Sequence, residues 1–312
     1  MGKIAFVFPG QGSQTVGMGK SVVEKNDQAK SIFESADQRL GYSLSDIIFN
    51  GPDEKLTLTT NAQPALLTTS IAILTCLEEA GIRPDYTAGH SLGEYSALVA
   101  AGAMDFEDAV FAVHKRGEYM EEAVPNGEGT MAAILGMDRN DLQKVTDEVT
   151  ANGDSVQLAN LNCPGQIVIS GTVKGVEKAS VLAKEKGAKR ALPLQVSGPF
   201  HSELMKPAAQ KFVEVLDEVK VQDSKIPVIA NVTAAPISKA SDIKEKLIEQ
   251  LYSPVLWEDS VLTMLELGVD TFIEIGPGKV LSGLIKKINR NVKTYSVQDF
   301  ESCQQVVNEL KL

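Results

Sequence analysis

One serine of this chain has the neighbours of a catalytic nucleophile. Ser91 lies in the stretch Gly89-His90-Ser91-Leu92-Gly93, which has the pattern Gly-x-Ser-x-Gly. The residues before it, 84–88, predict a short strand, and residues 92–101 predict a helix. In a strand–turn–helix of this kind the glycines permit a strained backbone, and the serine oxygen projects at the top of a sheet. An ordinary glycine-rich turn is the alternative, but this context favours a nucleophile.

A serine nucleophile needs a base, and the chain has three histidines. His201 lies in a loop between a predicted strand and a predicted helix, where functional groups gather, so it is the candidate base; a capping or structural histidine is the alternative. His90 adjoins Ser91 on a tight turn and is expected to line the site. His114 lies among charged residues of a predicted helix and is expected to be solvated. No aspartate between Ser91 and His201 stands clearly at a strand end, which indicates a dyad whose imidazole is oriented by a backbone carbonyl.

The loop after the first predicted strand, Gly10-Gln11-Gly12, begins like a dinucleotide-binding fingerprint. Position 15 is threonine where the third glycine is required, and no acidic residue follows at the expected distance. The loop is therefore interpreted as flexible backbone whose N–H faces Ser91 and forms an oxyanion hole together with the N–H of Leu92. A plain strand-to-helix turn is the alternative.

Strands and helices alternate along most of the chain, which predicts an α/β fold with a parallel sheet covered on both faces. The expected strands are residues 3–8, 84–88, 130–135, 156–161, 166–170, 189–194, 227–231, 270–275 and 293–297. The expected helices are residues 19–40, 64–80, 92–101, 106–124, 139–150, 175–186, 202–219, 241–251, 254–267 and 280–288, with one more at the C-terminus. Residues 129–195 have the order βαββαβ of a ferredoxin-like unit. We therefore expect residues 1–128 and 196–312 to form one discontinuous catalytic domain, with 129–195 inserted.

The composition limits the partners that the chain can bind. With 312 residues, 43% of them hydrophobic, it can bury a large core. Its net charge of −11 argues against nucleic acid and against an anionic membrane surface. The three cysteines, Cys76, Cys163 and Cys303, lie far apart without metal-ligand spacing, as expected for reduced thiols. No apolar stretch approaches the roughly 20 residues of a membrane span. We expect a cytoplasmic monomer without a metal ion or bound cofactor.

Eight motifs follow one another along the chain. They are FPGQGSQ at 8–14, TNAQPA at 60–65, GHSLGE at 89–94, RG at 116–117, GEG at 127–129, the stretch 160–171, GPFH at 198–201 and GPG at 276–278. Each motif is weak alone, but in this order they are specific, and the whole chain resembles the malonyl-CoA:acyl-carrier-protein transacylases of bacterial fatty acid synthesis. The resemblance implies an α/β-hydrolase-like core with a ferredoxin-like insertion and a site between the two.

The resemblance also implies a role for individual residues. Ser91 would be the acylated nucleophile and His201 its base, with the imidazole oriented by the backbone carbonyl of Gln250. Gln11 and Leu92 would donate their N–H groups to the oxyanion. The substrate-binding residues would be Gln63, His90, Phe200 and Asn160. Phe200 would crowd a methyl group on the acyl α-carbon. Arg116 would bind the malonyl carboxylate, for which a guanidinium is suited because it pairs bidentately. Without the resemblance, Arg116 is expected to be a surface helix residue.

The implied reaction has two halves. Ser91 would take the malonyl group from malonyl-CoA, and the phosphopantetheine thiol of holo acyl carrier protein would then remove it, with no metal or cofactor. Two basic clusters are candidates for docking the acidic carrier: Lys189 and Arg190, and Lys286, Lys287, Arg290 and Lys293. The alternative is that these side chains merely solvate a helix end.

Two other functions remain open at this point. A serine esterase or thioesterase would use the same dyad with water as the second acceptor, since function depends on the site rather than on the fold. A non-catalytic nucleotide-binding or scaffold protein built around Gly10-Gln11-Gly12 would form no covalent acyl adduct.

Overall fold

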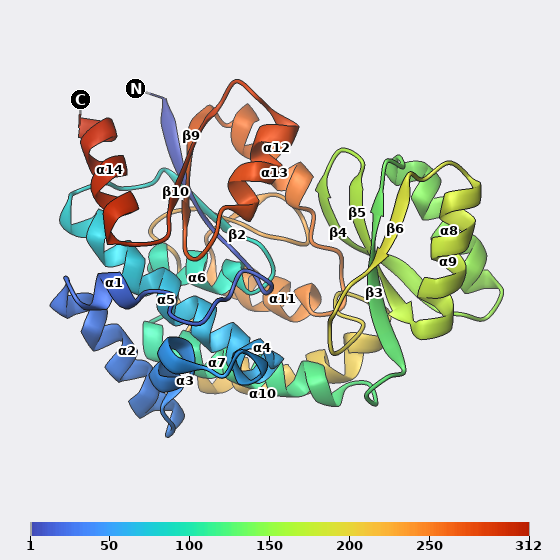
Figure 1. The fold of residues 1–312 in the computed structure, drawn as a ribbon, viewed down its shortest axis with the longest axis horizontal. Coiled ribbons are helices and arrows are strands. Elements are labelled where there is room, and N and C mark those ends of the chain that lie inside the picture. Colours follow the sequence, from blue (N-terminus) through green and yellow to red (C-terminus); the bar gives the residue numbers. More distant parts are fainter. Residues whose placement is uncertain (1, 312) are drawn as a thin grey trace.

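A six-stranded sheet forms the centre of the larger of two lobes (Figure 1). The structure is a computed structural model that describes residues 2–311. The strand order is β10-β9-β1-β2-β7-β8, and all neighbours are parallel except β7 and β8. The strands are β1 (Lys3–Phe8), β2 (Tyr86–Gly89), β7 (Val228–Ile229), β8 (Pro236–Ile237), β9 (Val269–Ile275) and β10 (Lys293–Val297).

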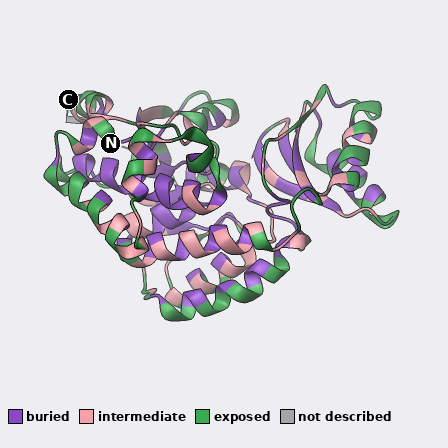
Figure 2. Cartoon of the chain, turned by 60° about the horizontal axis from the view of Figure 1, so that its bottom comes forward, coloured by how far each residue is buried: buried purple, intermediate pink, exposed green. Residues whose placement is uncertain are grey.

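Helices cover both faces of this sheet. Side chains alternate along β1: Phe6 and Phe8 join the core on one face, and Ala5 and Val7 join the core on the other, which contains Trp257. Buried positions accordingly lie on the inner sides of the helices and exposed positions on the outer sides (Figure 2). The helices of this lobe are α1 (Lys20–Val23), α2 (Asp27–Leu40), α3 (Leu44–Asn50), α4 (Asp53–Thr57), α5 (Thr59–Glu79), α6 (Gly93–Ala100), α7 (Phe106–Glu122), α10 (Lys206–Glu218), α11 (Ala240–Gln250), α12 (Trp257–Glu266), α13 (Val280–Ile288) and α14 (Phe300–Lys311), with a 3₁₀ turn, η1 (Glu203–Met205), before α10.

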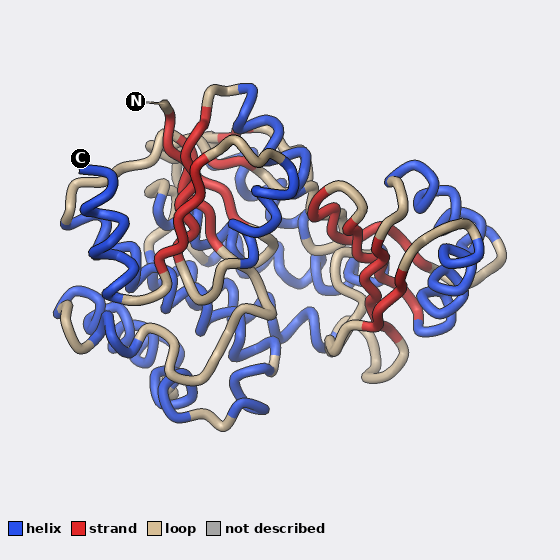
Figure 3. Tube along the Cα trace, turned by 45° about the horizontal axis from the view of Figure 1, so that its top comes forward, coloured by secondary structure: helices blue, strands red, loops and turns tan. Residues whose placement is uncertain are grey.

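The smaller lobe, residues 129–193, is a four-stranded antiparallel sheet with two helices on its outer face (Figure 3). Its elements follow the predicted βαββαβ order: β3 (Gly129–Leu135), α8 (Arg139–Ala151), β4 (Val156–Cys163), β5 (Gln166–Thr172), α9 (Val173–Glu185) and β6 (Arg190–Pro193). The spatial order is β4-β5-β3-β6. A separate apolar core fills the space between this sheet and its helices.

Backbone hydrogen bonds join the two lobes beside the end of α11. The N–H of Leu161 in β4 donates to the carbonyl of Val255 at 2.9 Å, and the N–H of Val255 donates to the carbonyl of Ala159 at 2.8 Å. The strand β4 is therefore tied to the segment that follows Gln250. This pairing also explains why the helix predicted for residues 254–267 begins only at Trp257.

Other helix and strand boundaries predicted from the sequence differ from those in the structure, for local reasons. The expected helix 19–40 is two helices, because Asn26 caps α2 and its side chain accepts the Ala29 N–H at 2.8 Å. The expected helix 64–80 already begins at Thr59, so Pro64 lies inside α5. The sequence did not predict α3, α4 or β8, whereas β1, β10 and α13 have the predicted bounds. Within residues 2–311, no helix combines the length and the hydropathy needed to cross a bilayer.

Candidate active site

Ser91 occupies a sharp turn between β2 and α6. Its φ is 52°, in the left-handed region that side chains rarely adopt. Gly93 makes the turn possible, because a Cβ there would lie 2.1 Å from the carbonyl oxygen of Phe8 at the end of β1. Asn231, just after β7, holds the turn from the other side: its Oδ1 accepts the Ser91 N–H at 2.7 Å, and its Nδ2 donates to the Gly89 carbonyl at 2.6 Å.

The imidazole of His201 links the serine to a backbone carbonyl. The Ser91 Oγ lies 2.8 Å from His201 Nε2, and His201 Nδ1 lies 2.8 Å from the carbonyl oxygen of Gln250. A carbonyl can only accept, so Nδ1 carries the proton and Nε2 is free to take one from the serine. Burial, with a smaller contribution from the positive charge of Arg116, lowers the pKa of His201 to about 3. The imidazole is therefore neutral and able to act as a base near neutral pH.

Arg116 lies beneath the serine and is 1% exposed, so the expectation of a surface position drawn from the residues alone is wrong. Its Nη1 donates to Gln63 Oε1 at 2.7 Å. Its Nη2 donates to Ser91 Oγ at 3.0 Å and to Gln250 Oε1 at 2.8 Å. The Nε–H has no hydrogen-bond partner among residues 2–311. A buried guanidinium therefore reaches the hydroxyl that a substrate acyl group would esterify.

Two buried side chains complete this network, and the sequence assigned no role to either. Glu94 Oε2 accepts from Gln250 Nε2 at 2.6 Å and from the Asn231 N–H at 3.2 Å. Burial raises the pKa of Glu94 to about 7, although both hydrogen bonds favour the charged form. A signal for Asn231 existed, because it ends a predicted strand and parallel strands bring their carboxyl ends to one edge. No comparable signal in the sequence marked Glu94, apart from its place directly after Gly93.

The loop predicted to supply an oxyanion donor passes against the serine turn. A Cβ on Gly10 would lie 2.4 Å from the carbonyl oxygen of His90, so only glycine allows this approach. Within residues 2–311, the backbone N–H groups of Gln11 and Leu92 donate to no protein acceptor. The Gln11 side chain donates to Thr59 Oγ1 at 3.2 Å, which anchors the loop to the start of α5.

A cavity of about 460 Å³ opens over the serine. Its wall includes Gln11, His90, Ser91, Asn160, Phe200 and His201. His90 Nε2 is 2.8 Å from Asn162 Oδ1, so its other nitrogen is the acceptor. Asn160 Oδ1 is buried without a hydrogen-bond partner in the described part of the chain. Gln63 is fully buried and does not line the cavity, but it contacts Arg116 and, through its Nε2 at 3.5 Å, the Sδ of Met120, which does line it.

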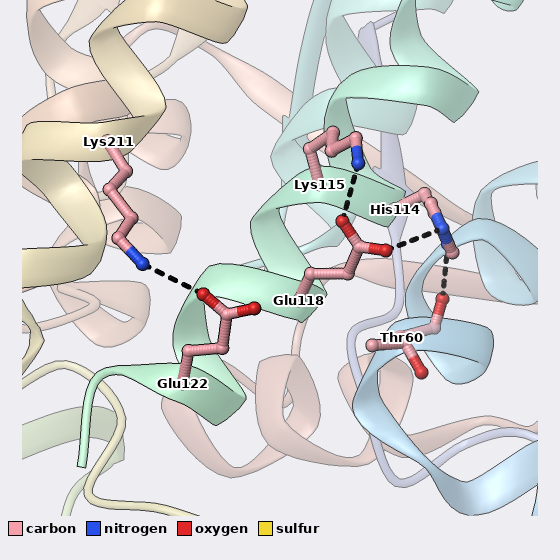
Figure 4. A network of polar contacts seen from close by, with 6 residues as sticks. All are labelled: Thr60, His114, Lys115, Glu118, Glu122 and Lys211. Carbon is pink, nitrogen blue, oxygen red and sulfur yellow. Dashed lines mark hydrogen bonds and ion pairs between the residues drawn. The ribbon is translucent and has the colours of Figure 1, made fainter.

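His114 is not the solvated residue that its helix pattern suggested (Figure 4). Its Nδ1 donates to the carbonyl of Thr60 at 3.0 Å, and its Nε2 lies 3.3 Å from Glu118. In an α-helix that carbonyl would accept the N–H of the residue four positions later, which is Pro64 and has none. His114 therefore satisfies a carbonyl that the proline leaves free, and it holds α7 to the start of α5.

The two basic clusters belong to different lobes: Lys189 and Arg190 lie at the start of β6, and the second cluster runs from the end of α13 to the start of β10. Leu135 of β3 pairs with Arg190 of β6 on one side and with Gln166 of β5 on the other. Lys287 donates to Gln166 Oε1 at 3.0 Å, which brings α13 to the same edge. Lys286 instead donates to the carbonyl of Arg290, just beyond the end of its own helix.

Among residues 2–311, no three His, Cys, Asp or Glu side chains are grouped so that they could hold a metal ion. Cys76, Cys163 and Cys303 are buried free thiols.

Comparison with known proteins supports the resemblance to malonyl transacylases along nearly the whole chain. Residues 5–309 match the acyl transferase domain family. The malonyl CoA-acyl carrier protein transacylase of Bacillus subtilis is 65% identical over 311 residues, which are 100% of this chain and 98% of that protein. The acyl carrier protein S-malonyltransferase of Vibrio cholerae superposes with a TM-score of 0.95 at 46% identity, covering 97% of this chain and 99% of that one. A malonyl-transacylase solved in complex with its holo type II polyketide synthase acyl carrier protein gives a TM-score of 0.95 at 43% identity, covering 98% and 99% of the two chains.

Proposed function

This chain belongs to the malonyl CoA-acyl carrier protein transacylases, and we propose that it moves a malonyl group from malonyl-CoA to the thiol of holo acyl carrier protein through an ester on Ser91. One observation carries the assignment of the site. The nucleophile lies 2.8 Å from a neutral imidazole and 3.0 Å from a buried guanidinium. A base activates the serine, and a fixed positive charge beside it suits an acyl group with a second carboxylate.

In the first half of the reaction, His201 Nε2 takes the proton of Ser91 as Oγ attacks the malonyl thioester. The N–H groups of Gln11 and Leu92 stabilise the oxyanion of the tetrahedral intermediate. When the C–S bond breaks, His201 returns the proton to the departing coenzyme A thiolate. In the second half, the phosphopantetheine thiol loses its proton to His201 and attacks the ester, and Ser91 regains a proton as it leaves.

Arg116 would hold the free carboxylate of the malonyl group. Its Nη2 gives up the hydrogen bond to Ser91 Oγ, and its unpartnered Nε–H offers a second donor, so a bidentate pair can form. Gln63 and Gln250 keep the guanidinium in place. His90, Asn160 and Phe200, which line the cavity, would contact the rest of the acyl group and the thioester.

The carrier protein would dock beside the cavity on the edge that carries Lys189, Arg190 and Lys287. The contact of Lys287 with Gln166 supports this, because Gln166 and Arg190 both pair with Leu135 and lie at the same end of the small sheet. The solved complex of a relative with its acyl carrier protein supports a carrier as the partner. We expect a monomer, and the buried free thiols fit a reducing compartment such as the cytoplasm.

The two lobes would correspond to two domains. The nucleophile after a central parallel strand supports an α/β-hydrolase-like core, residues 1–128 and 196–312. The βαββαβ order and the strand order β4-β5-β3-β6 support a ferredoxin-like insertion, residues 129–195.

Intact-protein mass tests the nucleophile. After exposure to malonyl-CoA, the wild-type chain should carry one malonyl adduct and Ser91→Ala none, since alanine removes only the hydroxyl. Stoichiometric malonylation of Ser91→Ala would refute the assignment. Measuring thiol release without an acceptor separates the transferase from a hydrolase: sustained release at the speed seen with carrier protein would favour the esterase.

A further inference from the structure

Glu94 is a buried carboxylate that the proposed chemistry leaves unused. Its side chain does not touch the cavity, and its only hydrogen-bond donors among residues 2–311 are Gln250 Nε2 at 2.6 Å and the Asn231 N–H at 3.2 Å. Burying a carboxylate is costly unless it is paired or hydrogen-bonded. This one lies in the helix that follows Ser91, one amide group away from Arg116.

The side chain of Gln250 connects the two charges. Its Nε2 donates to Glu94, and its Oε1 accepts from Arg116 Nη2 at 2.8 Å. The amide is therefore polarised by a carboxylate on one side and a guanidinium on the other, and each charge compensates the other. In the free enzyme the buried pair is close to neutral when Glu94 is ionised.

We propose that Glu94 is a specificity-determining positioning residue: its charge, transmitted through Gln250 and Arg116, opposes the binding of the substrate carboxylate until Glu94 takes up a proton. The inference rests on the proposed function, in which Arg116 pairs with the malonyl carboxylate. That carboxylate would be the second negative charge around one guanidinium. Two carboxylates that share one buried site raise each other's proton affinity.

The sign of the pH effect follows from linkage. Burial already raises the pKa of Glu94 to about 7 in the free enzyme. A malonyl carboxylate on Arg116 raises it further, so formation of the malonyl ester takes up protons between the two pKa values. Malonyl selection is then strongest below about pH 7 and weakens as the pH rises through that window, by on the order of tenfold. An acetyl group brings no charge and shows no such dependence.

The other groups around Glu94 do not titrate in this window. Three of these groups are titratable or charged: Arg116 from α7, His201 from the loop before η1, and Tyr95 from the same helix as Glu94. The other three are uncharged amides: Gln63 from α5, Asn231 after β7 and Gln250 from α11. The pKa of His201 is about 3, and burial holds the pKa of Tyr95 far above its usual range. Burial lowers the pKa of Arg116, but neighbouring Tyr95 and Glu94 oppose that shift and the guanidinium keeps its charge.

The experiment measures the ratio of kcat/KM for malonyl-CoA to that for acetyl-CoA from about pH 6 to pH 9. The ratio cancels the titration of coenzyme A phosphates and of His201, because both substrates share them. The wild-type ratio should fall about tenfold over this range. Glu94→Gln keeps an oxygen acceptor for Gln250 but has no charge, so its ratio should stay flat near the low-pH wild-type value. Glu94→Asp keeps the charge and should keep the fall.

Glu274→Gln is the matched control. Glu274 is also a fully buried carboxylate, but it accepts the N–H groups of Leu281 and Ser282 at the start of α13, outside the site. Its variant should keep the wild-type pH dependence. Proton uptake needs no variant: with an indicator dye near pH 8, malonylation of Ser91 should consume protons beyond those seen with acetyl-CoA.

The outcomes separate the two proposals. A wild-type ratio that does not change with pH, or a fall that persists in a folded Glu94→Gln, overturns the role of Glu94 while leaving the malonyl transfer intact. Absence of any malonyl adduct on Ser91 refutes the proposed function itself.

Discussion

The hydroxyl of Ser91 faces two groups that act on it differently. Arg116 Nη2 donates to its oxygen at 3.0 Å, and His201 Nε2 lies 2.8 Å away as an acceptor. With one lone pair occupied by the guanidinium, the hydroxyl proton is directed to the imidazole. In the proposed reaction, Arg116 would thus orient the Ser91 hydroxyl in the free enzyme before the malonyl carboxylate displaces that contact.

Arg116→Ala should impair malonyl transfer far more than acetyl transfer. Only the malonyl group would leave a buried carboxylate unpaired, which costs about 3–5 kcal/mol, or on the order of 10²–10⁴-fold in kcat/KM. Single-turnover acylation with each thioester measures the difference. Equal losses for the two substrates would mean that Arg116 acts on stability or on general geometry.

The pKa of His201 predicts the acid limb of the reaction. Because burial and the charge of Arg116 hold it at about 3, the imidazole stays an available base down to about pH 5, where an ordinary histidine is mostly protonated. Acylation by acetyl-CoA should therefore lose little rate between about pH 8 and pH 5. An acid limb with a midpoint near the ordinary histidine value would contradict the buried, neutral state.

The residue types and spacing around Ser91 predicted that this serine, a loop histidine and a backbone carbonyl would meet, and the structure brings the three together. They did not suffice for Arg116, because a helix pattern does not tell that α5 covers the face on which the guanidinium lies. The prediction for His114 was wrong for a similar reason. The carbonyl that it binds belongs to Thr60, 54 positions earlier, and is left free by Pro64, so the contact is visible only in three dimensions.

At the scale of elements, the approach of the β1 loop to the serine turn depends on a single glycine. Gly10→Ala would place a Cβ 2.4 Å from the carbonyl oxygen of His90, so the loop must move and its oxyanion donor with it. Loss of one such donor costs on the order of 10²–10³-fold in rate. Intact-protein mass after short malonyl-CoA exposure should therefore show much slower adduct formation.

Gly283→Ala in α13 is the control for that variant, because its added methyl meets no atom within 4 Å. It should acylate at the wild-type rate. If Gly10→Ala did the same while remaining folded, the loop would have no part in the oxyanion site.

Elements whose ends are set locally were predicted well, and those whose ends depend on distant contacts were not. The alternation of apolar residues and the flanking turns define β1, β10 and α13 within a few residues. The start of α12 depends instead on Val255, which cannot join the helix because it pairs with Asn160 of β4, nearly one hundred residues earlier. The short helices α3 and α4 are too brief to show a periodic pattern.

At the scale of the whole molecule, a net charge of −11 would repel an acidic carrier, so the proposed docking depends on a local basic surface. Changing Lys189, Arg190 and Lys287 together to Glu should raise the KM for carrier protein, and the defect should shrink as salt rises. Lys286 is left out because it binds the carbonyl of Arg290.

Transfer to free pantetheine should be nearly unaffected in that variant. Reversing Lys20, Lys25 and Lys30, on and between α1 and α2, makes the same change in net charge elsewhere and should leave the KM for carrier protein as it is. A KM that does not respond to the first triple change at low salt would place the docking surface elsewhere.

The proposed nucleophile, Ser91, and its proposed base, His201, both have left-handed backbone, with φ of 52° and 57°. For a residue with a Cβ such a conformation costs on the order of 1 kcal/mol. Ser91→Gly should therefore melt at a higher temperature than Ser91→Ala, although both lack the hydroxyl, and thermal denaturation compares them directly; equal melting temperatures would mean that the turn is unstrained. At Ser91 the backbone conformation alone would favour glycine, so the hydroxyl is kept there at a cost in stability, as expected of a side chain that serves turnover rather than folding.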